Sequence, residues 1–348
     1  MAKELYVIDG HSHIYASYFA PMRGQLTSPS GEPTKATYIF TMAIVGLIRK
    51  HNPDMLVVAM DSKTPTFRHE MYAEYKAHRP PMPEDMPGQI DKIEQILDAM
   101  HIPILRVDGY EADDIIGTLA KRAGEHGYEC IICSNDKDIL QLINDRVTTF
   151  NLKKQTQFGI EDMRQQMGIE PRQFVDALAL QGDTSDNIPG IPDVGPKTAL
   201  NWIKKYGSIE NLYEHSDEIK GKRGDNLRRH RRELELGREL VTIKCDVPLD
   251  IDESQMRLGS FDKARLTSLF KELGFTRLIR QMDLDDSDPS SDANKAADAD
   301  DLPGESAAPV RPESAKTVTH EYRLVDTPEA FETFLQELKK QKRFAIDT

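Results

Sequence analysis

The segment Leu5-Tyr-Val-Ile-Asp9-Gly10 opens the fold as a short apolar run that ends in an acid and a glycine. Similar apolar runs occur at 55–60, 102–107 and 130–133. Short continuous apolar runs are typical of parallel strands that helices cover on both faces. Between them, apolar residues recur at helical spacing over 90–100 and 115–120. This alternation predicts a doubly wound α/β fold with a mostly parallel sheet.

Four stretches of different composition divide the chain. We expect an α/β catalytic region over 1–160 and a helical region over 161–282, where the strand–helix alternation stops. Residues 283–316 are rich in Asp, Ser, Ala and Pro, which predicts a disordered acidic linker. A folded pattern resumes over 317–348, with a helix from Thr327 and a strand before Asp347, and we expect the truncated start of another α/β domain.

The net charge of −13 over 348 residues argues at first against a nucleic-acid partner. However, the predicted linker holds ten acidic and three basic residues, so just over half of that charge lies in a tenth of the chain. No apolar stretch is long enough to cross a membrane, and no signal peptide is visible. Three cysteines are too few for a disulfide framework, so we expect a cytoplasmic protein.

Acidic residues come directly after each predicted strand. Because the carboxyl ends of parallel strands share one edge, where ligands bind in open α/β sheets, these carboxylates should converge there. A single Asp in such a place is more often a helix cap, but several together repel each other unless cations neutralise them. All-oxygen ligands favour magnesium or manganese. The seven residues are Asp9, Asp61, Glu111, Asp113, Asp114, Asp136 and Asp138.

A zinc site is the weaker alternative. His11 and His13 flank the first acid, but the cysteine and histidine spacing of zinc sites is missing. Cys130 and Cys133 lie three apart in an apolar run, so in a strand they point to opposite faces and cannot share a metal. We interpret both as small buried side chains.

The segment 181–199 carries two further acids, Asp183 and Asp186, and then a Pro- and Gly-rich turn. The turn is typical of a helix–hairpin–helix, whose backbone amides, often with a bound monovalent cation, contact a DNA phosphate. Gly190 and Gly195 also have the glycine spacing of a P-loop. Pro196 occupies its lysine position and no strand precedes it, so we reject that interpretation.

Two basic segments could bind the phosphate that carboxylates repel. The first comes after the second strand, and in it Tyr75 beside Lys76 offers a stacking face with an ammonium, which suits a single strand. A solvated basic helix face is the alternative. The first segment contains Lys63, Arg68, Lys76, His78 and Arg79; the second, over 220–232, contains Lys220, Lys222, Arg223, Arg228, Arg229, Arg231 and Arg232.

Five motifs in order make the sequence resemble a known family. They are VIDG (7–10), YKAHRPPMP (75–83), EADD (111–114), NDKD (135–138) and GDTSDNIPG (182–190). They resemble the flap-endonuclease-type 5′ nuclease domain of bacterial DNA polymerase I, from about residue 3 to 282. The resemblance implies a two-metal 5′–3′ exonuclease and flap endonuclease that acts on 5′ flaps, nicks and RNA primers. It further implies a monomer that works on the bacterial nucleoid in DNA replication and repair.

The resemblance also implies roles for individual residues. Two divalent ions, Mg or Mn, would be held by the seven acids above with Asp183 and Asp186, and a potassium ion would sit at the hairpin. Lys76 and Arg79 would act in catalysis, in an arch over the active site. The implied DNA contacts are Arg68, Tyr75, Lys76, Arg79, Gly190, Val194, Gly195, Lys197 and Thr198.

The sequence departs from the family pattern in places. Asp193 stands in the hairpin where relatives usually have Gly; Asp tolerates a positive φ, but its charge would repel a phosphate. Ala16 stands where relatives often have Arg. Asp347 resembles the first metal ligand of a proofreading 3′–5′ exonuclease, whose remaining motifs are missing, as are polymerase motifs. We therefore expect neither proofreading nor DNA synthesis from this chain alone.

Two interpretations from other classes remain. A receiver-like signalling module would hold magnesium around a phosphoacceptor Asp61, but nine acids and a hairpin exceed what it needs. A non-catalytic, structure-specific DNA-binding protein would share the hairpin. Binding alone would favour neutral residues in place of some of the acids.

Overall fold

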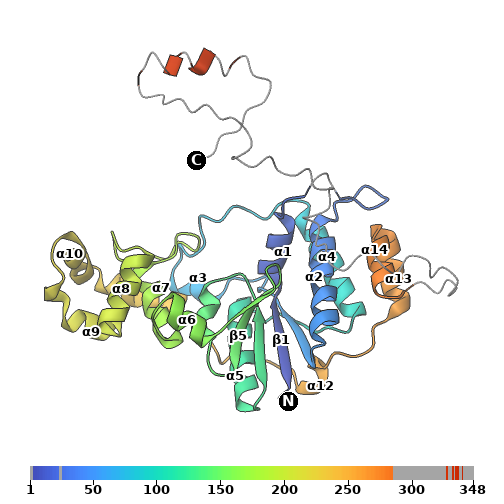
Figure 1. Cartoon of the computed structure of the whole chain (residues 1–348), viewed down its shortest axis with the longest axis horizontal. Helices are drawn as coiled ribbons and strands as arrows, with labels where there is room; N and C mark the ends of the chain where they lie inside the picture. The colour runs from blue at the N-terminus through green and yellow to red at the C-terminus, as the bar shows by residue number, and fades with distance from the viewer. Residues whose placement is uncertain are drawn as a thin grey trace, which may run out of the picture. The chain divides into compact units, whose positions relative to one another are not determined.

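A six-stranded sheet of order β3-β2-β1-β4-β5-β6 organises the computed structural model of the protein (Figure 1). The first five strands of that order are parallel, and β6 pairs antiparallel with β5. The doubly wound, mostly parallel α/β prediction is confirmed. The run at 102–107 forms a strand of only two residues, and the apolar pattern does not predict the last two strands. The strands are β1 (Glu4–Asp9), β2 (Met55–Ala59), β3 (Ile104–Leu105), β4 (Glu129–Cys133), β5 (Val147–Asn151) and β6 (Thr156–Phe158).

Helices connect the strands and continue beyond them. Those of the first half are α1 (Gly10–Tyr18), α2 (Lys35–His51), α3 (Phe67–Met71), α4 (Met86–Ala99) and α5 (Ala112–Glu125). Those after the sheet are α6 (Ile160–Gln166), α7 (Phe174–Gln181), α8 (Pro196–Tyr206), α9 (Ile209–Glu214), α10 (Lys222–Arg229), α11 (Arg231–Val241), α12 (Glu253–Met256), α13 (Lys263–Leu273) and α14 (Thr276–Gln281).

Two hydrophobic cores cover the two faces of the sheet. Alternate residues of β1 divide between them, Tyr6 and Ile8 facing α2 and α4, and Leu5 and Val7 facing α5. Burying each such aliphatic side chain contributes roughly 1.5–3 kcal/mol. The same alternation places the two cysteines of β4 in different cores, as predicted. These cores hold the strand ends, and with them the acids, in fixed positions.

A third core belongs to the helical region. It joins α7, α8, α9 and α11 through residues such as Leu178, Ile203, Leu212 and Leu240. Helices α13 and α14 do not join it: Leu266, Phe270 and Leu278 pack in the core beneath α2 and α4. The predicted helical region over 161–282 therefore includes two helices that return to the α/β region.

Gly10 lets α1 start directly at the end of β1. A Cβ atom here would lie 2.3 Å from Met60 Sδ and 2.8 Å from the carbonyl oxygen of Ala59. Any side chain would push α1 away from the end of β2. The glycine thus keeps Asp9, which caps α1 by accepting a hydrogen bond from Ser12 N, at the carboxyl edge of the sheet.

The structure describes residues 3–22 and 26–284, and beyond them only residues 327, 331, 332, 334–336 and 339. The chain divides into two units, Met1–Pro289 and Ser290–Thr348. In the second, residues 331, 332 and 334–336 are helical. The predicted linker beyond residue 284 and Asp347 lie outside the described residues. None of the helices in the described part is long and apolar enough to cross a membrane.

His13 gives the fold a sensitivity to acid. Its buried ring lies on α1, and Nε2–H donates to the carbonyl oxygen of Cys133 at 3.1 Å, which ties the helix to β4. Burial lowers the pKa of His13 to about 4. Between this value and the ordinary 6.5, the unfolded chain binds the extra proton and the folded chain does not, so stability falls as the pH falls through that window.

We predict that His13→Gln, which can keep the hydrogen bond without titrating, flattens this loss. Between pH 7.5 and 5.5 the wild type should lose about 1 kcal/mol more unfolding free energy than the variant. Urea titrations at the two pH values measure the difference. Equal losses in both proteins would contradict a neutral buried His13.

Candidate active site

The carboxyl ends of β1, β2 and β4 bring three acids to one edge of the sheet. Asp9 ends β1, Asp61 lies two residues past β2, and Asp136 lies three past β4. Asp61 Oδ1 accepts a hydrogen bond from Ala112 N at 2.9 Å, which joins the end of β2 to the start of α5. The order of the strands therefore gathers side chains that lie up to 127 residues apart in the sequence.

Ser134 connects two of these acids, and sequence reasoning does not find it. Its hydroxyl donates to Asp9 Oδ2 at 2.6 Å and accepts from Asp136 N at 3.0 Å. A serine after a strand is too common to stand out in a sequence. The one feature of the sequence that could have indicated Ser134 is its place directly before the predicted site motif at 135–138.

Two acids at this edge, Asp9 and Asp113, have a raised pKa. Burial raises the pKa of Asp9 to about 7, and Asp61 and Asp136 add to the rise against hydrogen bonds from Ser134 and Ser12. For Asp113, burial and then the same neighbours raise the pKa well above its usual range. Four carboxylates therefore lie close enough to repel one another in a partly desolvated place. We call Asp9, Asp61, Asp113 and Asp136 the acid edge.

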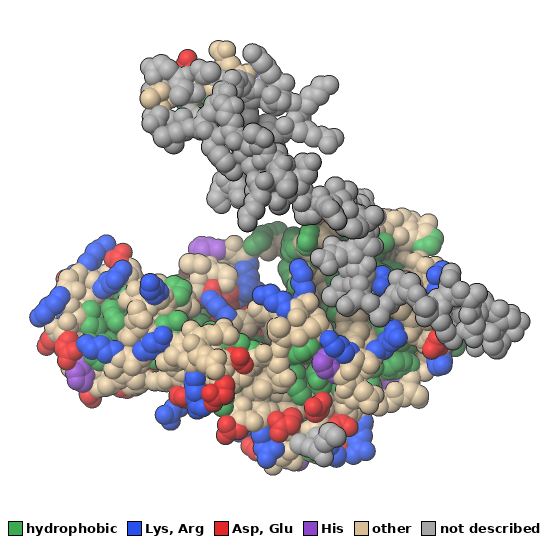
Figure 2. All heavy atoms as spheres, viewed as in Figure 1, with side chains coloured by type: hydrophobic (Ala, Val, Ile, Leu, Met, Phe, Trp, Pro, Cys, Tyr) green, Lys and Arg blue, Asp and Glu red, His purple; other side chains and the backbone are tan. Residues whose placement is uncertain are grey.

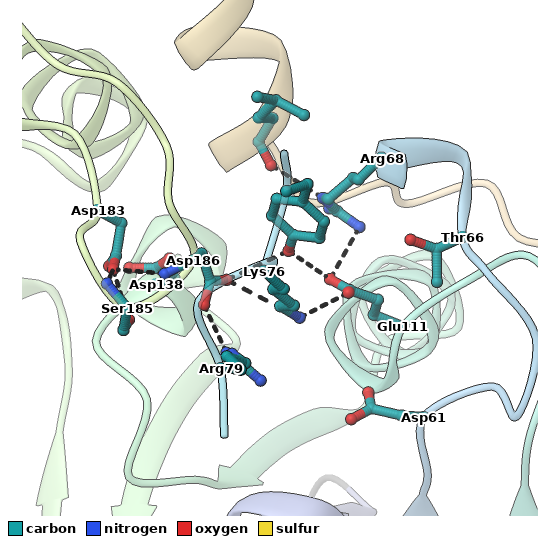
Figure 3. Close-up of polar contacts among 12 residues, drawn as sticks. Asp61, Thr66, Arg68, Lys76, Arg79, Glu111, Asp138, Asp183, Ser185 and Asp186 are labelled. Atoms are coloured by element: carbon teal, nitrogen blue, oxygen red, sulfur yellow. Dashed lines mark hydrogen bonds and ion pairs between the residues drawn. The ribbon is translucent and has the colours of Figure 1, made fainter. Parts of the chain in front are cut away.

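Residues 67–79, the main part of the first predicted basic segment, bring cations to the neighbouring acids, as Figure 3 shows. We call residues 67–79 the basic segment. Lys76 Nζ lies 2.6 Å from Glu111 Oε1 and 3.8 Å from Asp186 Oδ2. Arg79 Nη2 lies 2.5 Å from Asp186 Oδ1. The backbone amide of Lys76 also donates to the carbonyl oxygen of Asp186. These contacts hold the segment across Glu111 on one side and the turn that carries Asp186 on the other.

A second group of acids lies at the entry to the hairpin. Asp183 accepts hydrogen bonds from Ser185 N at 2.7 Å and its hydroxyl at 2.5 Å, and Lys137 Nζ lies 3.0 Å away. Burial alone would raise its pKa, but these contacts bring the pKa of Asp183 below its usual range. Asp138 differs, because burial and Asp136 raise its pKa to about 7 and its Oδ1 is buried with no hydrogen-bond partner.

Asp114 and Arg68 form a buried ion pair, which corrects their predicted roles. Arg68 is 3% exposed and Asp114 0%. The guanidinium donates to both carboxylate oxygens, at 2.7 and 2.9 Å. An acid with both oxygens engaged away from solvent is not placed to bind a metal ion, and a buried guanidinium cannot reach DNA. The sequence does not reveal this pair because its members lie 46 residues apart.

Tyr75 is also buried, which corrects the prediction of a stacking face. The side chain is 3% exposed and packs in the core of the helical region. Its hydroxyl donates to Glu111 Oε2 at 2.9 Å or to Asp186 Oδ2 at 3.2 Å. The ring is therefore used inside the protein, and its contribution is to place two carboxylates.

The donor chemistry of these two groups fits divalent cations. The atoms that these acids offer to a metal ion are all carboxylate oxygens. Asp9 and Asp113 have a raised pKa, and the buried Oδ1 of Asp138 has no hydrogen-bond partner. Over the described ranges, no three potential ligands already converge on one point. Glu111, Asp186 and Asp183 are instead paired with Lys76, Arg79 and Lys137. His11 accepts from Asp61 N through Nδ1, so that nitrogen is engaged.

The hairpin between α7 and α8 tolerates Asp193 because of two contacts from α10. Asp193 adopts φ 66°, as its place in the turn requires. Its carboxylate lies 2.9 Å from Lys222 Nζ, which lowers the pKa of Asp193, and 3.1 Å from Asn226 Nδ2. The charge that should repel a phosphate is thus paired within the protein.

The remaining hairpin residues divide into a packed and an open set. Gly190 lies against the backbone of Gln181 and Gly182, where a Cβ would come within 2.4 Å, and Val194 is buried with its amide bonded to Ile191 O. These two residues shape the turn. The residues that face solvent are Gly195 and Lys197, with Thr198 half-buried.

We predict that Asp113→Asn stabilises the protein when a chelator removes divalent cations. Removing one charge from the acid edge relieves repulsion, and the midpoint of thermal unfolding at pH 7.5 should rise by about 2–4 °C. Asp145→Asn, an exposed acid before β5 and so at the opposite edge, should leave the midpoint unchanged. A midpoint that falls in Asp113→Asn would contradict the mutual repulsion.

Two family models match consecutive parts of the chain. The first, described as "5'-3' exonuclease, N-terminal resolvase-like domain", covers residues 4–168, which hold the sheet and the acid edge. The second, "5'-3' exonuclease, C-terminal SAM fold", covers residues 169–264, which hold the hairpin and its helices.

Several curated proteins are similar in sequence. The 5'-3' exonuclease of Aquifex aeolicus is 38% identical over 281 residues, which is 81% of this chain and 96% of that protein. DNA polymerase I of Bacillus caldotenax is 38% identical over 305 residues, 85% of this chain, and that of Mycobacterium tuberculosis is 39% identical over 280 residues. This chain spans about a third of the length of these polymerases.

Solved structures share the fold at lower identity. The phage T5 D15 flap endonuclease has a TM-score of 0.56 at 19% identity, covering 81% of this chain and 98% of that one. The catalytic core of Rad2 has a TM-score of 0.55 at 16% identity, covering 82% and 93%. The fold, the two family models and a relative matched over nearly its whole length agree, and the chain belongs to the 5′–3′ exonuclease family.

Proposed function

We propose that this chain hydrolyses phosphodiester bonds near 5′ ends in DNA, as a metal-dependent 5′–3′ exonuclease and 5′-flap endonuclease. The observation that carries the proposal is the acid edge: four carboxylates that repel one another beside a basic segment. Such a charge cluster is suited to hard divalent cations. The T5 5′-exonuclease solved with zinc and the T5 D15 enzyme solved with DNA and metal ions support it.

The two groups of acids suggest two cation positions. The acid edge with Glu111 would hold one magnesium or manganese ion, and Asp138, Asp183 and Asp186 would hold or shape the other. When bound, such ions activate water and stabilise the charge of the displaced phosphodiester oxygens. The chain's own part is to fix the carboxylates on rigid strand ends, through Ser134 and the backbone amide of Ala112.

Lys76 and Arg79 would hold the phosphate next to this site. Lys76 is paired with Glu111 and Arg79 with Asp186, so both cations lie among the candidate site acids, where an anion would be bound. The ammonium acts as a point charge, and the guanidinium fork can hold two phosphate oxygens. Thr66 N and Oγ1 contact His69 Nδ1 at the start of α3, which fixes the beginning of the segment.

The hairpin would bind the duplex part of the substrate. Gly195, Lys197 and Thr198 present an open glycine, an exposed ammonium and the first turn of α8 to a backbone phosphate. A potassium ion at the hairpin would join this contact. Gly190 and Val194 contribute by shaping the turn. Near it, Lys197 and the exposed arginines of α10, Arg223, Arg228 and Arg229, form what we call the basic surface.

The polymerase relatives suggest the biological setting. The resemblance to DNA polymerase I implies a role in DNA replication and repair. We therefore propose DNA with 5′ flaps or nicks, and RNA primers, as the substrates. We propose that the chain acts as a monomer in the bacterial cytoplasm, on the nucleoid. Synthesis of DNA is not proposed for the residues described.

We predict that Asp136→Ala strongly slows the cleavage of a 5′-flap substrate in magnesium. The loss should be roughly 100-fold or more, because the variant lacks an acid of the edge. A gel assay of a labelled flap under single-turnover conditions measures it. Asp145→Ala, at the opposite edge of the sheet, is the matched control and should cleave like the wild type.

Two results would count against the proposal. If Asp136→Ala cleaved the flap at the wild-type rate, the acid edge would have no role in catalysis. Flap binding without cleavage by the wild type, in magnesium and in manganese, would favour the non-catalytic DNA-binding protein.

We predict a second effect at the hairpin, where Lys222 keeps the charge of Asp193 from a bound phosphate. Lys222→Ala should raise the Kd for a nicked duplex by about 3- to 10-fold at fixed salt. In an Asp193→Asn background, which has no carboxylate to neutralise, the same change should raise it by about 2-fold or less. Fluorescence anisotropy measures both, and equal losses would instead make Lys222 a direct DNA contact.

A further inference from the structure

The buried guanidinium of Arg68 joins three segments that are far apart in the sequence. It lies on α3 at the start of the basic segment, and besides Asp114 it donates to the carbonyl oxygens of Leu240 and Thr242, at 2.9 and 3.0 Å. Nη1 also lies 3.3 Å from Glu111 Oε2. One side chain thus connects α3, the start of α5 and the chain leaving α11.

Asp114 completes this arrangement from the other side. Its Oδ2 accepts a hydrogen bond from Glu111 N at 3.1 Å, which closes the first turn of α5. Its Oδ1 accepts from Lys244 N at 2.9 Å. The carboxylate therefore fixes the backbone of Glu111 and the segment after α11. We call Arg68 and Asp114, with these contacts, the buried ionic node.

Glu111 is the point where the node meets the candidate active site. Arg68 and Tyr75 contact its Oε2, and Lys76 contacts its Oε1, so three side chains of the basic segment determine where this carboxylate lies (Figure 3). Two of the three are buried. A displacement of Arg68 would therefore move Glu111 and Lys76 together.

The energetics of buried ion pairs argue for placement as the role of this node. Removing two charges from water is costly, and apolar residues of similar volume often stabilise a protein as well. What an apolar pair cannot do is impose direction: the guanidinium fork meets acceptors from three segments at fixed angles. A lysine offers no such fork and would leave buried acceptors unsatisfied.

We propose that Arg68 is a positioning residue, which acts through Asp114 and Glu111 to set the carboxylate of Glu111 and the basic segment over the acid edge. The proposal deepens the proposed nuclease function and rests on it for its kinetic part. Its structural part, that the node holds three segments together, stands without any activity.

Hydrogen exchange tests the structural part. In Arg68→Lys, the amides of Glu111 and Lys244 and those of residues 67–76 should exchange at least about 10-fold faster, while the amides of β1 and β4 keep their rates. Arg122→Lys, a half-buried arginine of α5 that donates to Leu249 O, is the matched control. If Arg68→Lys does not fold, Asp114→Asn makes the same test. Unchanged exchange at all these amides would overturn the node.

A double-mutant cycle tests the kinetic part. On a saturating 5′-flap substrate, Arg68→Lys should slow single-turnover cleavage about 10- to 100-fold and change the substrate Kd by less than about 3-fold. In a Glu111→Gln background, Arg68→Lys should slow the remaining cleavage by less than about 3-fold, because its effect passes through the missing carboxylate. If Arg68→Lys instead caused a general loss of structure, it would slow cleavage by the same factor in the wild-type and Glu111→Gln backgrounds.

The outcomes separate the two proposals. Additive losses in the cycle would overturn positioning through Glu111 while the nuclease function stands. A wild type that cleaves no flap would remove the nuclease function, and the kinetic part with it, while the exchange result still decides whether the node exists.

Discussion

Repulsion between carboxylates at one edge of the sheet is the constraint on which the rest of the site depends. The strand order places Asp9, Asp61 and Asp136 together, and α5 adds Asp113. Such charges cannot all stay ionised in a partly buried place without compensation. The protein offsets part of this charge in two ways: Ser134 donates a hydrogen bond to Asp9, and the basic segment brings cations to the neighbouring acids. Within the described part of the chain, the four carboxylates of the acid edge form no ion pair with these cations, and this supports the cation position that we propose there.

Burial determines how strongly each ion pair around the site can hold segments of the protein in place. Arg68 and Asp114 are almost fully buried, so their contacts are unscreened and directional. Lys222 and Asp193 are exposed, and a pair in water contributes little to stability. The first pair can therefore fix three segments, whereas the second can only change the charge that a bound phosphate meets. The difference lies in the environment, because both pairs join a base to an aspartate at under 3 Å.

The fold and the acid edge are predictable from the sequence because both depend on local pattern. Apolar runs locate β1, β2 and β4, and the rule for parallel sheets places the acids at their carboxyl ends on one edge. The buried roles of Arg68 and Tyr75 are not predictable, because each depends on partners that the sequence does not indicate: Arg68 meets Leu240 across 172 residues. The same reason hides the return of α13 and α14 to the α/β core. A basic or aromatic residue in a motif suggests a ligand contact, although burial assigns both of these residues to the protein's interior.

The charge of the chain is better understood by region than in total. Exposed lysines and arginines gather over α8 and α10, on the left of the view in Figure 2, while the acid edge lies at the carboxyl ends of the strands. A duplex held at the hairpin by the basic surface would be attracted there, and its 5′ end would approach the acid edge only with cations present to offset the repulsion. A net charge of −13 is therefore compatible with a DNA partner. On the proposed function, this segregation of charge would require metal ions to bring the phosphate to the acids, before any chemistry there.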